Sequence, residues 1–174
     1  MNRRYFLSSA LAVGTVAALS RLPIKAVQQQ SRNHDGVKGI NKGVKKMTKT
    51  NVEWKQILTP QQYEVTRNQG TEAPYSSPLN SNHEHGVFEC VCCQLPLFNS
   101  DAKFDSGTGW PSFWAPIAKE NVQEKTDNTL GMTRTEVECA RCDAHIGHVF
   151  DDGPKPTGLR YCMNGVALKF VPKT

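Results

Sequence analysis

The first 50 residues of this 174-residue chain almost lack acidic side chains. Asp35 is the only acid among them, whereas the same segment holds 10 of the chain's 21 Lys and Arg residues. Residues 51–174 therefore carry 11 basic and 15 acidic groups, a net charge of −4, although the whole chain has a net charge of +5. The positive charge belongs to the N-terminal segment, and the mildly acidic remainder argues against nucleic acid as a partner.

The chain also lacks the length for two sizeable domains and, apart from two short cysteine pairs, any internal repeat. With 174 residues and 38% hydrophobic content, it can bury one ordinary core. We therefore expect a single globular domain, with a monomer as the default state.

No apolar run reaches the roughly 20 residues that span a bilayer, but residues 1–20 have the organisation of an export signal. The Arg3-Arg4 pair precedes the mostly apolar residues 5–19, which end among small residues. Residues 3–7 resemble the twin-arginine signal that exports folded proteins across the bacterial inner membrane. An ordinary signal peptide or an uncleaved anchor helix is the alternative. We expect an exported protein in the periplasm or an equivalent compartment.

Residues 21–50 show no periodicity and little apolar content, which predicts a flexible linker before a domain at residues 51–174. Met47 lies just before that domain. Translation from Met47 would give a cytoplasmic form without the signal, which is the alternative localisation.

The domain itself is expected to be mainly β, with few helices. Thr59-Pro60-Gln61-Gln62 combines a capping hydroxyl, a proline suited to the first turn and a glutamine at the third position, so a short N-terminal helix is predicted through Arg67. Strand-forming stretches at residues 86–90, 133–138 and 160–171 are separated by turn residues. This pattern predicts antiparallel sheets.

Four of the six cysteines form two Cys-x-x-Cys units, Cys90 to Cys93 and Cys139 to Cys142. This spacing lets two thiolates bind one tetrahedral ion, so the two units predict a zinc knuckle with one structural ion. A closed site of four thiolates has no open position for water, and its ion stabilises the fold. Disulfides and a redox-active dithiol are the alternatives. Cys92 is interpreted as a bystander thiol.

Cys162 belongs to neither pair and lies in an expected strand, where Arg160 and Asn164 share its face. A neighbouring guanidinium favours the thiolate, the nucleophilic form of cysteine. The core residues Val166 and Leu168 are expected to continue that face. The alternative is that Cys162 is a small buried apolar residue.

His145 and His148 follow directly on the second cysteine pair. They are suited to donate protons in a reaction that releases oxygen as water. They could instead be ordinary partly buried residues, or replace two cysteines as metal ligands. In the glycine-rich loop at residues 104–114, the glycines suggest a bend that presents Trp110 at a cleft, whereas Trp110 and Trp114 as core residues are the alternative.

These motifs closely resemble those of the methionine-R-sulfoxide reductases of the MsrB type, over Trp54 to Phe170. The motifs that carry the resemblance are Cys90-Val-Cys-Cys93, Pro96-Leu-Phe98, Lys103-Phe-Asp-Ser-Gly-Thr-Gly-Trp-Pro-Ser-Phe113, Arg134-Thr-Glu136, Cys139-Ala-Arg-Cys-Asp-Ala-His-Ile-Gly-His-Val-Phe-Asp-Asp-Gly-Pro154 and Thr157-Gly-Leu-Arg-Tyr-Cys-Met-Asn164. Long ungapped motifs of this kind are highly specific.

The resemblance implies a fold of two antiparallel sheets and the thiol-dependent reduction of methionine R-sulfoxide, with repair of oxidised proteins as the purpose. It implies attack by Cys162, which becomes a sulfenic acid, supported by Arg160. It also implies that Trp110 and Phe150 contact the S-methyl group. The remaining implied roles are oxygen positioning or protonation by His145, His148 and Asn164, and structural zinc on Cys90, Cys93, Cys139 and Cys142.

The chain departs from the family pattern at Thr108, where many relatives carry a second, resolving cysteine. The sulfenic acid on Cys162 is then expected to react with an external thioredoxin- or glutaredoxin-like thiol, unless Cys92 resolves it. Two further hypotheses stay open. One is a zinc-binding recognition module without catalysis, and the other is a reductase of free methionine sulfoxide in place of oxidised proteins or peptides.

Overall fold

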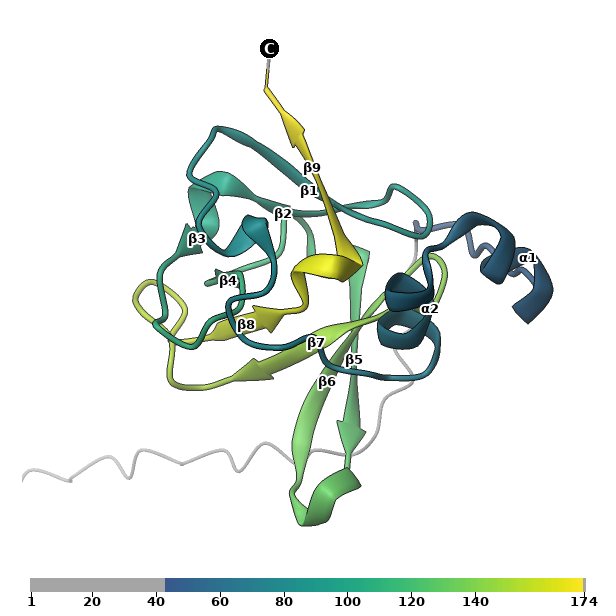
Figure 1. Ribbon diagram of the computed structural model, residues 1–174. Coiled ribbons are helices and arrows are strands. Elements are labelled where there is room, and N and C mark those ends of the chain that lie inside the picture. Colours follow the sequence, from purple (N-terminus) through teal and green to yellow (C-terminus); the bar gives the residue numbers. More distant parts are fainter. Residues whose placement is uncertain (1–42, 174) are drawn as a thin grey trace, which may run out of the picture. The chain divides into compact units, whose positions relative to one another are not determined.

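The computed structural model describes residues 43–173 (Figure 1). The expected signal peptide and most of the expected linker lie outside the described residues. Among the described residues, no helix is long and apolar enough to cross a membrane. The helices and strands are α1 (Asn51–Ile57), α2 (Pro60–Arg67), β1 (Gly86–Cys90), β2 (Pro96–Asn99), β3 (Lys103–Phe104), β4 (Ser112–Phe113), β5 (Val122–Asp127), β6 (Arg134–Cys139), β7 (His145–Phe150), β8 (Arg160–Met163) and β9 (Leu168–Pro172). Short 3₁₀ turns occupy Pro78–Asn80, Ser100–Ala102, Lys119–Asn121, Thr129–Gly131 and Gly165–Ala167.

Both α-helices begin with a capping box, in which the cap hydroxyl accepts from the third residue's N–H while that residue's side chain accepts from the cap N–H. Helix α2, capped by Thr59, ends at Arg67 as the sequence predicts. Helix α1, capped by Thr50, was not predicted, because seven residues are too few to show helical periodicity. Its Trp54 is buried, with the Arg67 guanidinium 5.0 Å from the ring centre.

The segment just before α1, which the sequence assigns to the linker, contacts the domain. The Met47 N–H donates to the Arg141 carbonyl at 2.7 Å. Val44 and Met47 pack against the core, and Lys46 pairs with Asp143. The ordered contacts of the domain therefore begin several residues before position 51.

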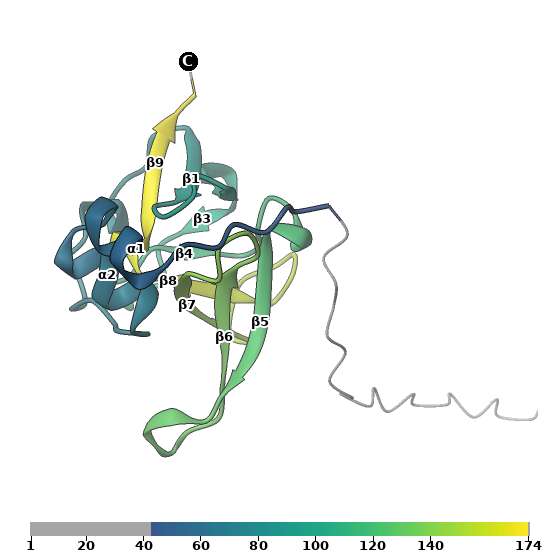
Figure 2. The ribbon, with the colours of Figure 1, turned by 90° about the vertical axis from the view of Figure 1, so that its right-hand side faces the viewer.

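Two antiparallel sheets make up the fold, as expected. One has three strands in the order β2-β1-β9, and the other has six in the order β3-β4-β8-β7-β6-β5. Helix α2 packs beside β7 and beside the 3₁₀ turn that leads into β9 (Figure 2). The end of the β5–β6 hairpin projects beyond the other strands in both views.

The single strand expected at residues 160–171 is wrong, because the chain changes sheet within it. Strand β8 belongs to the six-stranded sheet and β9 to the three-stranded one, with the turn Gly165–Ala167 between them. The buried Glu72 carboxylate bends the chain here by accepting from the N–H groups of Gly165 at 2.6 Å and Val166 at 2.9 Å. The alternation of faces therefore does not continue from Cys162 to Leu168.

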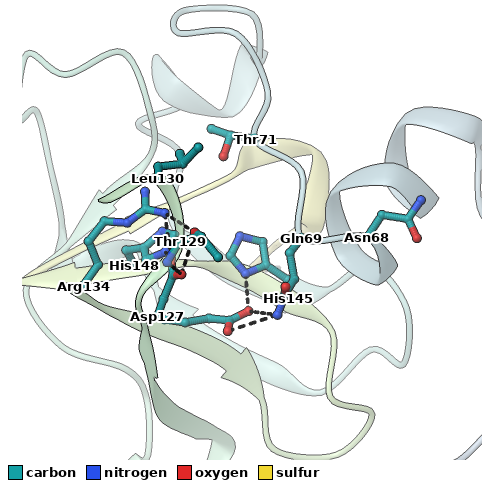
Figure 3. Close-up of a pocket in the computed structure, with 10 residues that line it drawn as sticks. Asn68, Gln69, Thr71, Asp127, Thr129, Leu130, Arg134, His145 and His148 are labelled. Carbon is teal, nitrogen blue, oxygen red and sulfur yellow. Dashed lines mark hydrogen bonds and ion pairs between the residues drawn. The ribbon is translucent and has the colours of Figure 1, made fainter. Parts of the chain in front are cut away.

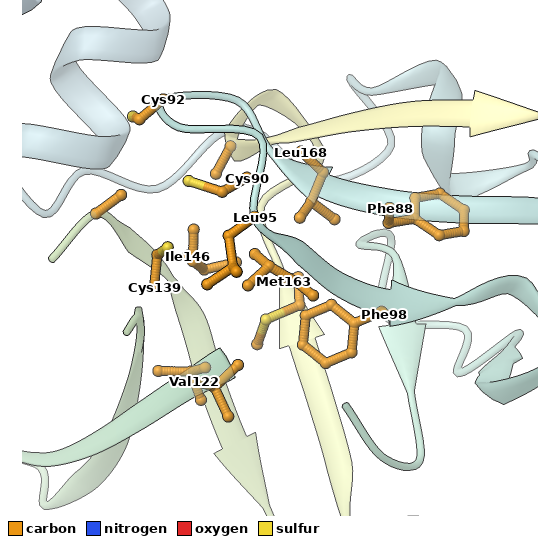
Figure 4. Close-up of a cluster of buried hydrophobic side chains, with 14 of the residues drawn as sticks. Phe88, Cys90, Cys92, Leu95, Phe98, Val122, Cys139, Ile146, Met163 and Leu168 are labelled. Carbon is orange, nitrogen blue, oxygen red and sulfur yellow. The ribbon is translucent and has the colours of Figure 1, made fainter. Parts of the chain in front are cut away.

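An aromatic cluster joins the two sheets, and Figure 4 shows two of its rings, Phe88 and Phe98, among other buried apolar side chains. Phe98 of β2 stacks on Phe113 of β4 with ring centres 4.5 Å apart, and Phe88 of β1 meets Phe113 edge-on at 5.0 Å. All three side chains are fully buried. Tyr161 and Met163 of β8 point into this core, so the alternate residues of β8, including Cys162, face away from it.

Candidate active site and metal centre

The two Cys-x-x-Cys units fold into matching turns at the ends of β1 and β6. In the first, the Gln94 N–H donates to the Cys90 carbonyl at 2.8 Å, and in the second the Asp143 N–H donates to the Cys139 carbonyl at 3.0 Å. Gln94 and Asp143 both have positive φ, 58° and 56°. The same local geometry thus turns each thiol pair toward one point.

The four sulfurs at that point lie within 4.8 Å of one another. Sγ to Sγ is 3.7 Å for Cys90 and Cys142, and 3.5 Å for Cys93 and Cys139. Four thiolates bound tetrahedrally at about 2.3 Å would lie roughly 3.8 Å apart, so the arrangement fits one metal ion. A disulfide needs about 2.05 Å, which excludes the disulfide alternative for these pairs.

Neither Cys92 nor the histidines join this group in the described part of the chain. The structure therefore places Cys93, and not Cys92, in the group with Cys90, as the sequence predicts, and it gives no support to histidine ligands. Contacts with the Cys139 and Cys142 sulfurs raise the pKa of Cys90, as expected where thiols share one site. A bound cation would let all four act as thiolates.

A second site lies around Cys162, which lines a cavity of about 130 Å³. Strand β8 is flanked by β4 and β7, so Ser112 and His148 are the direct register neighbours of Cys162. The residues that line the cavity are Thr71, Trp110, Arg134, Gly147, His148, Phe150, Cys162 and Asn164.

The Cys162 thiol is partly exposed, and its Sγ lies 3.8 Å from the Thr108 hydroxyl. Burial raises the pKa of Cys162 above its usual value, while Thr108, Arg160 and Ser112 act in the opposite direction. The sequence leads us to expect that Arg160 favours the thiolate. Arg160 does lower the pKa, but burial outweighs it, so the resting thiol is protonated at neutral pH.

The guanidinium of Arg160 has another partner. It donates from Nε and Nη2 to the two carboxylate oxygens of Asp152, each at 2.8 Å, and this pairing raises the pKa of Arg160. It also lies over the Phe150 ring, 4.4 Å from its centre. Arg160 therefore fixes the ring that forms one wall of the cavity.

Trp110 is fixed by the segment that follows α2. Its Nε1–H donates to the Glu72 carbonyl at 3.1 Å, and the Tyr75 N–H donates to the Gly109 carbonyl at 2.7 Å. Gly107 and Gly109 have positive φ, and a Cβ on Gly109 would lie 2.9 Å from the Tyr75 ring. The predicted bend around Thr108 is therefore confirmed, and Trp110 is half-buried at the cavity, whereas Trp114 packs on the core.

The two histidines each bond to a carboxylate (Figure 3). His145 Nδ1 lies 2.6 Å from Glu136, and His148 Nε2 lies 2.8 Å from Asp127, which also accepts from Arg134 at 2.6 Å. Burial lowers the pKa of His148, although Asp127 acts in the opposite direction. His148 is therefore neutral at neutral pH.

A family profile described as "SelR domain" matches residues 58–172. The chain belongs to the SelR family. Among curated relatives, "Peptide methionine sulfoxide reductase MsrB" of Herminiimonas arsenicoxydans is 57% identical over 125 residues, covering 72% of this chain and 91% of the relative. The protein of the same name from Pseudomonas putida strain GB-1 is 55% identical over 130 residues, covering 75% and 99%.

The SelR fold brings most of the expected residues into the Cys162 cavity. Trp110, His148, Phe150 and Asn164 line it together with Cys162. The remaining two expected residues, Arg160 and His145, lie close to this cavity. Arg160 is the register neighbour of Phe150. His145 lines an adjoining cavity of about 270 Å³, which shares Thr71, Arg134 and His148 with the Cys162 cavity.

Sequence reasoning missed the residues that hold this SelR site in place. Glu72 binds the turn after Asn164 through its carboxylate, and its backbone N–H donates to the Asn164 Oδ1 at 3.0 Å. Asn164 Nδ2 in turn donates to the Ile146 carbonyl at 3.1 Å. Neither Glu72 nor Asp127 belongs to a sequence motif that would mark it as functional. Glu136 belongs to the motif Arg134-Thr-Glu136, but the sequence gives it no specific function.

Proposed function

We propose that this SelR-family protein reduces methionine R-sulfoxide, with Cys162 as the nucleophile. One observation carries the proposal. The thiol lines a small cavity in which two fixed aromatic rings, Trp110 and Phe150, accompany the polar groups of His148 and Asn164. Such a cavity suits the end of a methionine sulfoxide side chain, which joins a methyl group, a sulfur and one polar oxygen.

The chemistry follows from the protonation states of the site. Neutral His148 takes the thiol proton, and the resulting thiolate attacks the sulfoxide sulfur. This attack forms a bond between the cysteine sulfur and the substrate sulfur, and the imidazolium returns the proton to the sulfoxide oxygen. The protonated oxygen then moves to the cysteine sulfur, while its bond to the substrate sulfur and the sulfur–sulfur bond both break. The sulfoxide gains two electrons and becomes the thioether, while Cys162 loses two and becomes a sulfenic acid.

Selectivity for the R epimer follows from rigidity. Trp110 is held by the Glu72 carbonyl and Phe150 by Arg160. The two rings proposed to contact the methyl group therefore keep a fixed position relative to the polar groups of His148 and Asn164. In the R epimer the oxygen reaches His148 and Asn164 while the sulfur faces Cys162. In the S epimer, methyl group and oxygen are interchanged at the same sulfur.

The ion that we propose for the four-cysteine site is zinc, because four thiolates in a closed tetrahedral set suit it. When bound, zinc supplies structural stabilisation only, since all four positions are filled by protein. Cys90, Cys93, Cys139 and Cys142 would hold it.

Turnover requires a thiol that reduces the sulfenic acid with release of water. Thr108, which contacts Cys162, has no thiol, and Cys92 is buried beside the metal-site cysteines. These positions favour direct reduction by an external thioredoxin- or glutaredoxin-like protein. We also propose that the protein acts as a monomer in the repair of oxidised proteins.

An extracytoplasmic location rests on residues 1–20 alone. Fractionation of the native cells, with N-terminal sequencing of the protein, tests it. We expect a periplasmic form that has lost the signal. A wholly cytoplasmic protein that begins at Met47 would contradict export, and such a form would keep the contact between Met47 and Arg141.

The activity is tested with separate R and S epimers of N-acetyl-methionine sulfoxide methylamide, with dithiothreitol as reductant. We expect the wild-type protein to reduce the R epimer only and Cys162→Ser to reduce neither. If zinc-loaded wild-type protein reduced neither epimer, the chain would be a zinc-binding module without this catalysis.

A further inference from the structure

A hydroxyl chain, made of Thr108, Ser106 and Ser112, leads from the sulfur of Cys162 to the start of β4. The Thr108 hydroxyl lies 3.8 Å from the Cys162 sulfur. Ser106 Oγ lies 2.8 Å from Thr108 Oγ1 and 2.7 Å from Ser112 Oγ. In each of these contacts either atom can donate, so the hydroxyl chain can direct its hydrogens toward the sulfur or away from it.

The far end of the hydroxyl chain is a backbone carbonyl. Ser112 Oγ donates to the Trp110 carbonyl at 3.1 Å, and a carbonyl can only accept. While the thiol is protonated, the hydroxyls can therefore point away from the sulfur and end on this carbonyl. Once the sulfur is a thiolate, the hydroxyls can rotate so that Thr108 donates to the sulfur, Ser106 to Thr108 and Ser112 to Ser106. No proton changes its oxygen in this reversal.

The hydroxyl chain and the proposed base approach Cys162 from different strands. Strand β8 runs between β4 and β7, where Ser112 and His148 are the register neighbours of Cys162. His148 takes the thiol proton in the proposed function, so the negative charge left on the sulfur needs donors from elsewhere. The hydroxyl chain supplies such donors from the β4 side.

Packing alone does not require a serine at position 112. Ser112 is 1% exposed and precedes the fully buried core residue Phe113. Burial of a hydroxyl is unfavourable unless the hydroxyl is hydrogen-bonded, and alanine would occupy the same strand position with no polar group to satisfy. The buried serine is explained by its bonds within the hydroxyl chain.

The Cys162 thiolate needs such donors because burial disfavours its charge. Burial raises the pKa of Cys162, whereas the Thr108 and Ser112 hydroxyls oppose this effect. The Arg160 guanidinium opposes it too, but it also donates to both carboxylate oxygens of Asp152. Hydrogen bonds to an ionised acceptor are roughly twice as strong as neutral ones, and hydroxyls in series strengthen one another. The hydroxyl chain is thus suited to stabilise a thiolate more than a thiol.

We propose that the hydroxyl chain turns its hydrogens toward Cys162 and stabilises the thiolate during its attack on the sulfoxide. Thr108 touches the reacting sulfur, whereas Ser106 is a positioning residue that acts through Thr108. Ser112 completes the hydroxyl chain from β4. This inference rests on the proposed function, in which Cys162 is the nucleophile, and adds the groups that favour its charged form.

The pH dependence of Cys162 alkylation by iodoacetamide tests the hydroxyl chain without any substrate. Zinc-loaded protein is used, and the peptide that contains Cys162 is followed by mass spectrometry. Loss of a donor disfavours the thiolate, so the midpoint of the profile should move to higher pH. At pH 7.5 we expect the rate to fall about five-fold in Thr108→Val and about three-fold in Ser106→Ala. Thr108→Ser restores a hydroxyl and should recover most of the rate, and Ser81→Ala, at an exposed position outside both cavities, should match wild type.

A double variant tests whether Ser106 acts through Thr108. Ser106→Ala should add almost nothing to the effect of Thr108→Val, because the bond between the two hydroxyls is already lost. The same variants are assayed at pH 7.5 with N-acetyl-methionine sulfoxide methylamide of the R configuration, the single-residue R substrate. We expect kcat/KM to fall by about the same factors as the alkylation rate.

Three results would overturn the inference. They are a wild-type alkylation midpoint in Thr108→Val, a lower kcat/KM without a shifted midpoint, and full additivity of the two substitutions. A shifted midpoint in the variants, together with a wild-type protein that fails to reduce the R substrate, would support the hydroxyl chain and count against the proposed function.

Discussion

The hydroxyl of Thr108 lies 3.8 Å from the sulfur of Cys162, on the loop that the two glycines beside it bend toward β8. Cysteine differs from threonine here by a sulfur in place of the hydroxyl and by the loss of a methyl group. A sulfur at this position would be within reach of a disulfide after small adjustments.

Thr108→Cys should therefore convert an externally reduced enzyme into one that resolves its own sulfenic acid. After one equivalent of substrate without reductant, we expect the introduced thiol to be joined to Cys162, observed as a disulfide-linked peptide pair by mass spectrometry. Thr108→Ser keeps the hydroxyl and should accumulate a sulfenic acid that dimedone traps. A Thr108→Cys protein that still accumulates the dimedone adduct would show that the loop is held too rigidly for the bond.

Asp127→Asn should shift the acid limb of the pH profile to lower pH. In the proposed mechanism protonated His148 cannot take the thiol proton, so we expect kcat/KM to fall as pH falls through the pKa of His148. Burial already lowers that pKa, and the Asp127 carboxylate opposes the effect. Removing the negative charge lowers the pKa further, so activity should persist to lower pH while its maximum decreases about ten-fold, because the imidazolium loses its partner.

The measurement is kcat/KM for the single-residue R substrate from pH 4.5 to 8, together with the titration of His148 by NMR. Asp101→Asn removes an exposed carboxylate that lines neither cavity and serves as the control. An acid limb that moves to higher pH in Asp127→Asn would contradict the assigned role of His148 as the base.

Cys93→Ala and Cys92→Ala should separate metal binding from packing, because the two cysteines are adjacent in sequence and both buried. Only Cys93 belongs to the four-sulfur group. We expect about one zinc per chain in Cys92→Ala and much less in Cys93→Ala, with a melting temperature at least about 10 °C lower for the latter. Metal analysis and thermal unfolding check this, and equal zinc contents in the two variants would refute the ligand assignment.

The features that the sequence predicts well are those that depend on neighbours along the chain. The Cys-x-x-Cys turns and the capping box of α2 each need four or five consecutive residues, and both are found as predicted. Strand alternation predicts that Arg160 and Asn164 share the face of Cys162, whereas the joining of Trp110, His148 and Phe150 to this group was available only through the resemblance of long motifs.

The features that it does not predict depend on contacts between distant segments. Glu72 bonds to Gly165 and Val166, 93 and 94 residues later, and this contact divides the expected strand at residues 160–171. The alternation of residues within that strand gives no sign of the division. The raised pKa of Cys162 also depends on distant segments. The sequence shows Arg160 two residues away on the same face, but the burial that outweighs its effect comes from other strands.

Glu72→Gln should destabilise the fold and also impair catalysis. Both carboxylate oxygens accept backbone N–H groups in a buried place, at 2.6 Å and 2.9 Å, so the amide would turn an NH₂ group toward one of them. We expect the free energy of unfolding in urea to fall by about 1–3 kcal/mol. Glu84→Gln, at an exposed position, should leave it unchanged.

The catalytic effect follows because the backbone of Glu72 bonds to both Asn164 and Trp110. A shift of this loop moves together the amide that we propose to position the oxygen and the ring that we propose to contact the methyl group, so kcat/KM for the R epimer should fall about ten-fold or more. The ratio of R to S turnover should fall with it, because the two groups that distinguish the epimers lose their fixed relation. If stability fell while the kinetics and the epimer ratio stayed at wild-type values, Glu72 would support the turn at Gly165–Ala167 without positioning the site.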